Sequence, residues 1–219
     1  MPPVVSVVGR SKSGKTTLME KLLSELGNRG FRIATIKHVH NDVEFDKPGK
    51  DSWRHIEAGS QAAVVSSSEK VQLIKPVSGS AGVAELVRLI GEDYDLVITE
   101  GFKRDNAPKI MVHRSEIGPP PANLSKLIAV VGDEPACRET RHFHSDDIGG
   151  IADLLEKGFI LPQRERTSLY INGMPVELSS FPRRFITSTL LGMVASLKGV
   201  GNIESLDIFL RREKRGEWK

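Results

Sequence analysis

The sequence holds a single cysteine, Cys137, among its 219 residues. One thiol excludes a disulfide framework and any zinc site built from several thiolates. The sequence also lacks an apolar run near the ~18 residues that a membrane-spanning helix needs. Its Met-Pro-Pro start has neither the basic segment nor the cleavage pattern of a signal peptide. We therefore expect a cytoplasmic protein with no membrane partner, a location that a lone cysteine also fits.

An excess of one charge sign is also missing. Lys and Arg together number 31 and Asp and Glu 28, which gives a net charge of +3 and a pI near 9.0. Aromatic residues make up 5% of the chain, and no basic patch carries interspersed aromatics, so no nucleic-acid partner is expected. Hydrophobic residues at 39% and charged residues at 27% are typical of a folded globular chain. Its length suits one domain plus a small module.

Apolar strand-like and helix-like segments alternate through the first 160 residues. The predicted strands are 4–8, 32–36, 62–66, 70–74, 96–99, 109–112 and 127–131. The predicted helices are 15–26, 53–58, 83–90 and 147–157, the last capped by Ser145 or Asp146. The short junction at 67–69 favours an antiparallel hairpin. Most other strands are apolar on both faces, which predicts an α/β fold with a doubly wound, mostly parallel sheet.

The C-terminal part has a different rhythm. A Pro-led charged segment, 162–167, predicts a linker between a domain at 1–161 and a small α+β module at 168–219. Asn172-Gly173 between two apolar runs is a strong hairpin signal. A helical apolar face follows at 181–197, and 206–210 reads as a last strand. We therefore expect a ββαβ module.

Residues 9–16 read Gly-Arg-Ser-Lys-Ser-Gly-Lys-Thr and match the phosphate-binding loop (P-loop, Walker A) pattern between a buried strand and a helix. Gly9 allows a tight turn, and Gly14 allows the backbone to approach a phosphate. The successive N–H groups of this loop and the helix N-terminus form a positive concavity. Lys15 is expected to reach the terminal phosphates, and the Thr16 hydroxyl to hold Mg²⁺. The remaining loop residues expected to contact the nucleotide are Ser11, Lys12 and Ser13. This predicts a P-loop NTPase-type nucleotide-binding domain.

A magnesium site also needs an acid near that loop. Asp95 and Glu100 stand at opposite ends of one predicted strand, ~16 Å apart. Because ligands bind at the carboxyl ends of parallel strands, Glu100 is the expected metal ligand and catalytic acid. The alternative for Glu100 is a helix cap or a loop ion pair, whereas Asp95 reads as structural.

The polar segment 37–52 leaves the sheet at the same edge. Its His-x-His pair and alternating acids, among them His38, Asp46 and Asp51, suit a metal, a phosphate-bearing ligand or a partner; the alternative is a solvated loop.

The Asn-Lys-x-Asp signature for guanine is missing. Asp133, which ends a late strand, is a candidate acceptor for guanine N1 and N2. A second His-x-His, at 142–144, reads as an ordinary strand or loop, and Cys137 has no base beside it.

Several strings together resemble the molybdopterin-guanine dinucleotide biosynthesis adaptor (MobB) family over about residues 4 to 155. Besides the P-loop, they are Ile36–Asp42, Asp46–Ser52, Ala58-Gly59 and Asp95–Lys103. The resemblance implies a P-loop protein that binds GTP and Mg²⁺, hydrolyses GTP slowly at most and forms a homodimer. It further implies assistance to the molybdenum cofactor guanylyltransferase, which attaches GMP to molybdopterin. By carry-over, phosphates and magnesium are held by Gly14, Lys15, Thr16 and Thr17, with Glu100 as the second-motif acid. Asn41 departs from the histidine that the family often has.

Two alternatives remain open from the residues. A P-loop small-molecule kinase needs an acceptor site and a lid with arginines, for which Arg104 and Arg114 are the candidates, each in a short loop. A nucleotide-switched binding module without significant hydrolysis would have the same motifs. The C-terminal module lies outside the resemblance.

Overall fold

The computed structural model describes residues 1–39, 45–134 and 140–212. The chain divides into two compact units, Met1–Arg166 and Thr167–Lys219. In the described part of the chain, no helix has the length and apolar character needed to cross a bilayer.

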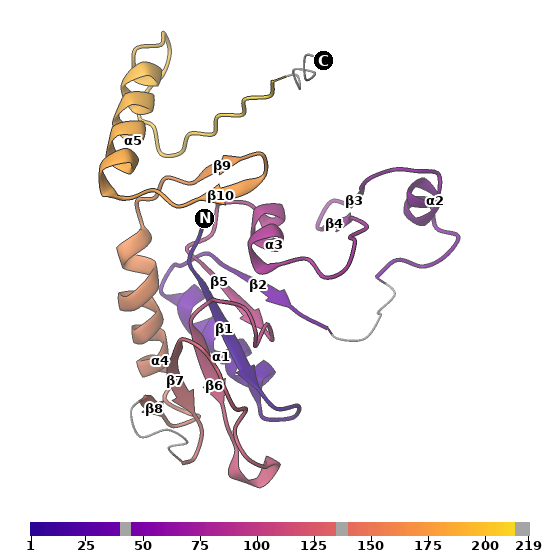
Figure 1. Ribbon diagram of the computed structural model, residues 1–219, viewed down its shortest axis with the longest axis vertical. Helices are drawn as coiled ribbons and strands as arrows, with labels where there is room; N and C mark the ends of the chain where they lie inside the picture. Colours follow the sequence, from indigo (N-terminus) through magenta and orange to yellow (C-terminus); the bar gives the residue numbers. More distant parts are fainter. Residues whose placement is uncertain (40–44, 135–139, 213–219) are drawn as a thin grey trace, which may run out of the picture. The chain divides into compact units, whose positions relative to one another are not determined.

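A six-stranded sheet forms the centre of the first unit, and every neighbouring pair in it is parallel (Figure 1). Its spatial order is β2-β5-β1-β6-β7-β8. The strands are β1 (Val4–Gly9), β2 (Ile33–Lys37), β5 (Leu96–Glu100), β6 (Lys109–Val112), β7 (Leu127–Val131) and β8 (Arg141–Phe143). The predicted parallel α/β sheet is confirmed. Strand β8 overlaps residues 142–144, for which the sequence left a strand or a loop open, because so short a segment produces no clear periodic signal.

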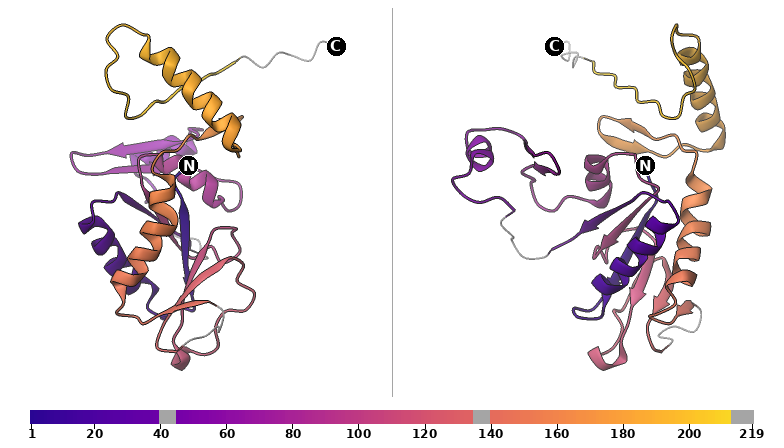
Figure 2. Two further views of the ribbon diagram at one scale, coloured as in Figure 1. Left: turned by 90° about the vertical axis from the view of Figure 1, so that its left-hand side faces the viewer. Right: turned by 180° about the vertical axis from the view of Figure 1, so that it is seen from behind.

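Helices cover both faces of the sheet. Helices α1 (Lys15–Asn28) and α4 (Ile148–Leu155) pack on one face, where Leu22 and Leu155 are completely buried against β-strand residues (Figure 2). Helix α3 (Val83–Ile90) covers the β2–β5 side of the other face through Val87. Alternate residues of one strand therefore enter different cores, which explains why the strands are apolar on both sides.

Helix α4 begins later than the sequence suggested. Its N-cap is Asp147, whose carboxylate accepts a 2.9 Å hydrogen bond from the Gly150 backbone N–H. The expectation of Ser145 or Asp146 as the cap is therefore wrong. The helix continues through a π-helical turn, Glu156–Ile160, and a 3-10 turn, Leu161–Gln163. The last turn runs into the segment expected as a linker.

A helix and a hairpin follow β2 in the first unit. Helix α2 (Asp51–Glu57) packs on β3 (Ala63–Ser66), which pairs antiparallel with β4 (Val71–Ile74). The Ser67 hydroxyl accepts from the Lys70 backbone N–H at 3.1 Å and so closes the hairpin turn. The predicted hairpin is confirmed, and α2 begins two residues before its predicted start.

The second unit contains a hairpin and one helix. Strands β9 (Leu169–Ile171) and β10 (Met174–Val176) pair antiparallel, and helix α5 spans Ser180–Ala195. Asn172 and Gly173 form the turn with φ angles of 52° and 85°, as the hairpin signal requires.

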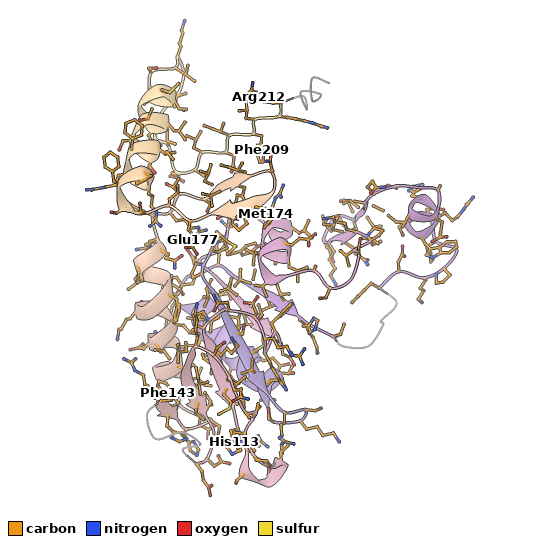
Figure 3. The ribbon with its side chains drawn as sticks, in the orientation of Figure 1. His113, Phe143, Met174, Glu177, Phe209 and Arg212 are labelled. Carbon is orange, nitrogen blue, oxygen red and sulfur yellow. The ribbon has the colours of Figure 1, made fainter. Side chains whose placement is uncertain are left out.

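The predicted last strand of this unit is wrong. Residues 206–210 have no regular secondary structure, and Phe209 is 94% exposed (Figure 3). Four of these five residues are apolar, which favours a strand, but a strand forms only where a neighbouring edge pairs with it. None of the described residues from 167 to 212 is buried.

Candidate functional site

The carboxyl ends of the strands meet at one edge of the sheet. Gly9 of β1 lies beside Val112 of β6, which lies beside Val131 of β7. Val131 in turn lies beside Phe143 of β8, labelled near this edge in Figure 3. Glu100 ends β5 on the other side of β1. This edge is where ligands bind in open parallel sheets, and β1 runs into the P-loop there.

Two glycines of the P-loop stand where a side chain would be strained, Gly9 by a close contact and Gly14 by its φ angle. A Cβ on Gly9 would lie 2.5 Å from the Val112 carbonyl oxygen. Gly14, the N-cap of α1, has a φ of 93°, and Lys12 also has a positive φ of 63°. Gly14 provides no side-chain cap, so the first N–H groups of α1 have no partner within the helix. Such a helix start attracts an anion.

Lys15 lies in the loop with its ammonium turned onto the backbone. Its Nζ donates a 2.7 Å hydrogen bond to the Arg10 carbonyl oxygen. Partial burial lowers the pKa of Lys15, the Glu100 carboxylate opposes that shift, and Lys103 and Lys37 add to it. A phosphate at this position would favour the charged form of the lysine.

Thr16 and Glu100, predicted as a pair, are brought together. The Thr16 Oγ1 atom lies 3.5 Å from both carboxylate oxygens of Glu100, longer than a usual hydroxyl–oxygen hydrogen bond of ~2.7 Å. Lys37 Nζ lies 3.8 Å from Glu100 Oε2. A hydroxyl and a carboxylate are donors that Mg²⁺ prefers, so the residues fit that ion. The structure describes no group of three or more His, Cys, Asp or Glu arranged for a metal.

Asp95, at the opposite end of β5, has the structural role expected for it. Its Oδ2 accepts from the Arg32 backbone N–H at 2.8 Å, and its own N–H donates to the Arg32 carbonyl at 2.8 Å. These two bonds join the start of β5 to the entry of β2.

His38 lies beside the Glu100 backbone. The His38 N–H donates a 3.0 Å bond to the Glu100 carbonyl oxygen, and its ring lies 4.6 Å from the Phe102 ring, centroid to centroid. A Cβ on Gly101 would lie 3.2 Å from His38 Cβ, and Gly101 has a φ of 103°. Only a glycine therefore lets these two chain segments approach closely.

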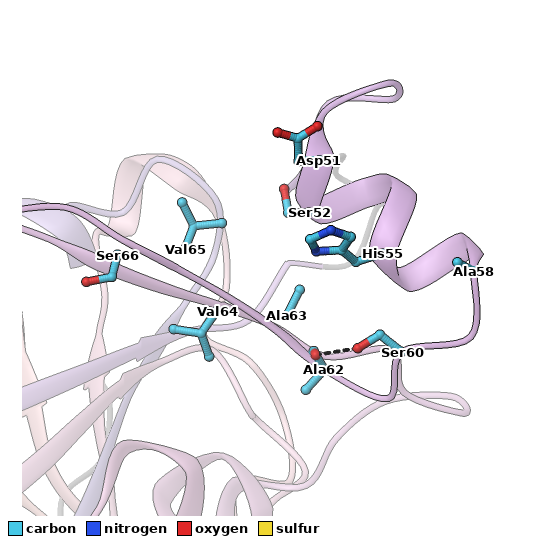
Figure 4. A pocket seen from close by; sticks show the side chains of 10 residues that line it. All are labelled: Asp51, Ser52, His55, Ala58, Ser60, Ala62, Ala63, Val64, Val65 and Ser66. Atoms are coloured by element: carbon cyan, nitrogen blue, oxygen red, sulfur yellow. Dashed lines mark hydrogen bonds between the residues drawn. The ribbon is translucent and has the colours of Figure 1, made fainter.

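Asp46 and Asp51 are not joined to the P-loop by a hydrogen bond or ion pair in the described residues. The Asp46 Oδ2 atom is buried without a hydrogen-bond partner in that part of the chain. Asp51 opens α2 and lines a surface hollow of about 720 Å³ with Ser52, His55 and β3 (Figure 4). Three further residues of the polar segment 37–52 lie outside the described residues: His40, Asp42 and Glu44. Cys137, after β7, also lies outside them.

Asp133 follows β7 at the P-loop edge. The preceding Gly132 passes so close to β6 that a Cβ there would lie 2.1 Å from the His113 carbonyl oxygen. Asp133 Oδ1 lies 3.8 Å from His144 Nε2, the residue after β8. The structure places this carboxylate two strands away from β1 and brings it into no polar contact with the P-loop among the described residues.

An arginine that the sequence indicates only as a lid candidate lies at the loop. The Nη2 atom of Arg114 is 3.4 Å from the Cβ position on Gly14. Arg10, Ser13 and Arg114 are among the residues around a narrow cleft beside the loop, which has no room for a water molecule in this structure. The sequence does indicate this position, because Arg114 comes two residues after the carboxyl end of the predicted strand 109–112, and ligands bind at that end.

Comparisons with known proteins agree with this geometry. A Haemophilus influenzae protein named molybdopterin-guanine dinucleotide biosynthesis adapter protein is 38% identical over 159 residues, which cover 70% of this chain and 88% of that protein. A relative in Methanocaldococcus jannaschii is 26% identical over 232 aligned positions, which cover 94% of this chain and 96% of that protein. Because the match covers nearly the whole chain, it extends into the second unit.

A solved structure titled molybdopterin-guanine biosynthesis protein B matches with a TM-score of 0.57 at 30% identity, over 74% of this chain and 99% of that one. The family model described as molybdopterin guanine dinucleotide synthesis protein B matches residues 4–133. With the P-loop at the carboxyl edge of a parallel sheet and Glu100 beside Thr16, these matches show that the chain belongs to the MobB family.

Proposed function

We propose that this chain is a GTP-binding adapter in the biosynthesis of molybdopterin-guanine dinucleotide. The observation that carries the proposal is a P-loop whose Thr16 Oγ1 atom lies 3.5 Å from the Glu100 carboxylate. The family and the names of its curated relatives support the pathway.

The nucleotide would lie along the edge of the sheet. Its terminal phosphates would contact Lys15 and the loop N–H groups, with Ser11, Lys12, Ser13 and Thr17 completing the cradle. Its guanine base would reach Asp133, two strand spacings or ~10 Å from β1. A carboxylate there accepts hydrogen bonds from guanine N1 and N2, which adenine does not offer.

Mg²⁺ would be held by the Thr16 hydroxyl and the Glu100 carboxylate. Bound there, the ion would neutralise charge on the terminal phosphates. Glu100 itself is held in place by β5, and the His38 N–H bonds to its carbonyl oxygen. Asp46 and Asp51, outside the P-loop, are proposed to contact the pterin or a partner.

Hydrolysis is proposed to be slow at most. Fast GTPases place a residue that orients water and an arginine that stabilises the transition state. In the described residues Arg104 is exposed, and Arg114 lies beside Gly14 rather than on a lid helix. This arrangement does not favour the kinase alternative. It suits a protein that uses bound GTP for assembly.

The proposed partners are the molybdenum cofactor guanylyltransferase, molybdopterin and a second copy of the chain, in the cytoplasm. These follow from the resemblance to the family. Analytical ultracentrifugation of the protein with and without the transferase would test both assemblies.

Titration calorimetry with GTP and ATP in the presence of Mg²⁺ tests the central claim. We expect GTP to bind in preference to ATP. Lys15→Ala should weaken GTP binding by about 10- to 150-fold, because it removes a charged hydrogen bond to phosphate. Lys157→Ala, which removes an exposed lysine after α4 and outside the P-loop, is the control and should bind GTP as wild type does. Equal binding of ATP, or wild-type affinity in Lys15→Ala, would contradict the proposal.

A further inference from the structure

Arg114 reaches the P-loop from the end of a neighbouring strand. It comes two residues after β6 ends, and three atoms of its guanidinium group, Nη2, Nε and Cζ, lie 3.4, 3.7 and 3.8 Å from the Cβ position on Gly14. The guanidinium therefore lies against the residue that begins α1. A Cβ at position 14 would meet the guanidinium at ordinary van der Waals distance.

The charge of Arg114 is weakly compensated. Its ion pair with Glu116 has a distance of 3.7 Å between side chains that are 46% and 74% exposed. A pair of that kind contributes little, so the guanidinium can exchange this partner for a ligand. The first turn of α1 also contains no acidic residue. The region around Gly14 is therefore positive from both the helix start and the arginine.

A second polar group in the same cleft lacks a partner. Ser13 is 2% exposed, and its Oγ atom has no hydrogen-bond partner among the described residues. Ser13 and Arg114 line the cleft together. A buried hydroxyl of this kind is costly unless a ligand or water completes it.

The order of the strands indicates which part of a bound nucleotide would lie near Arg114. β6 lies between β1, which carries the P-loop, and β7, which carries Asp133. Adjacent strands lie ~4.8 Å apart. A nucleotide whose terminal phosphates lay over β1 and whose base lay over β7 would have its α-phosphate between the P-loop and the end of β6, where the Arg114 guanidinium lies against Gly14.

We propose that Arg114 binds the α-phosphate of the guanine nucleotide. This inference rests on the proposed GTP site. The planar fork of a guanidinium matches two phosphate oxygens, which an ammonium does not. Because GTP and GDP both carry an α-phosphate, Arg114 contributes equally to the binding of both and leaves the hydrolysis step alone.

The test measures GTP and GDP affinity by calorimetry on the full chain with Mg²⁺, together with single-turnover hydrolysis at saturating GTP. Arg114→Ala should weaken both nucleotides by the same factor, about 10- to 150-fold. Arg114→Lys should recover part of that loss, since it restores the charge without the fork. Arg104→Ala, an exposed arginine in another loop of this edge, is the matched control and should bind as wild type. Hydrolysis at saturation should be unchanged in all variants.

Three results would overturn the inference: wild-type affinity in Arg114→Ala, a loss confined to GTP, or a drop in the saturated hydrolysis rate. The last two would place the arginine at the γ-phosphate. Circular dichroism and the melting temperature check that the variants fold. If Arg114→Ala does not fold, the GTP and GDP affinities of Arg114→Lys test the inference. A wild-type protein that binds neither nucleotide overturns the proposed function and this inference together. Binding that depends on Lys15 but not on Arg114 overturns the inference alone.

Discussion

At the scale of single residues, close backbone approaches decide where the site residues lie. Gly132 is the tightest of them: a Cβ there would lie 2.1 Å from the His113 carbonyl oxygen. That carbonyl belongs to the backbone of the neighbouring strand end, which cannot turn away as a flexible side chain can. The contact keeps Asp133 level with the end of β6.

Gly132→Ala should therefore destabilise the protein by about 1–3 kcal/mol, because the added methyl forces the ends of β6 and β7 apart. Urea denaturation followed by circular dichroism measures this. Gly149→Ala in α4 is the matched control, since its Cβ would meet nothing within 4 Å, and alanine favours a helix over glycine by ~1 kcal/mol. Equal stability of the two variants would show that the strand ends separate freely.

At the scale of elements, an arginine joins the two helices of one sheet face. Arg29, at the end of α1, donates to Asp153 of α4 at 2.7 Å, to Glu156 at 2.8 Å and to Glu25 of its own helix at 2.8 Å. Lys157 and then Arg29 hold the pKa of Asp153 below its usual range. The three carboxylates raise the pKa of Arg29, so it stays charged.

Arg29→Met should lower the free energy of unfolding at pH 7, because three carboxylates lose their shared partner. A carboxyl whose folded pKa is depressed stabilises the protein above its unfolded pKa, near 3.8, and loses that contribution as pH falls through its folded pKa. The difference between wild type and Arg29→Met should therefore shrink below pH 3.8. Denaturation curves from pH 7 to pH 3 measure it.

Lys21→Met is the control for this helix face. It removes an ion pair with Asp146 between exposed side chains, 3.2 Å apart, and such pairs contribute little. A pH-independent difference for Arg29→Met, or a Lys21→Met effect of the same size, would mean that the arginine acts through packing rather than charge.

At the scale of the whole molecule, each candidate site residue lies in the first unit, whereas the second unit buries none of its described residues. The side chain of Arg166 donates to the backbone carbonyls of Glu92 and Tyr94. It thus belongs to the first unit, and a clean division of the chain falls after it.

A chain ending at Arg166 should bind GTP with wild-type affinity, because the strands that hold the site are all retained. It should lose assembly or partner capture if the exposed apolar residues of the second unit, such as Phe181 and Phe185, serve binding. Calorimetry and sedimentation measure the two effects. A chain ending at Gln163 is the comparison and should be less stable, since it lacks Arg166. Loss of GTP binding on removal of residues 167–219 would mean that the nucleotide site needs the second unit.

Local patterns determined much of this protein by themselves. Helix α3 and strands β6 and β7 begin and end where periodicity predicted. Five residues of extended chain separate Asp95 from Glu100, and the rule that ligands bind at the carboxyl ends of parallel strands placed Glu100 at the loop.

Tertiary structure decided the rest, because its causes are not local. The place of β6 between β1 and β7, and hence the contact of Arg114 with Gly14, depends on parallel pairing between distant segments. The mostly apolar residues 206–210 form no strand for the same reason: a segment that favours a strand pairs only when the fold supplies a neighbouring edge for it.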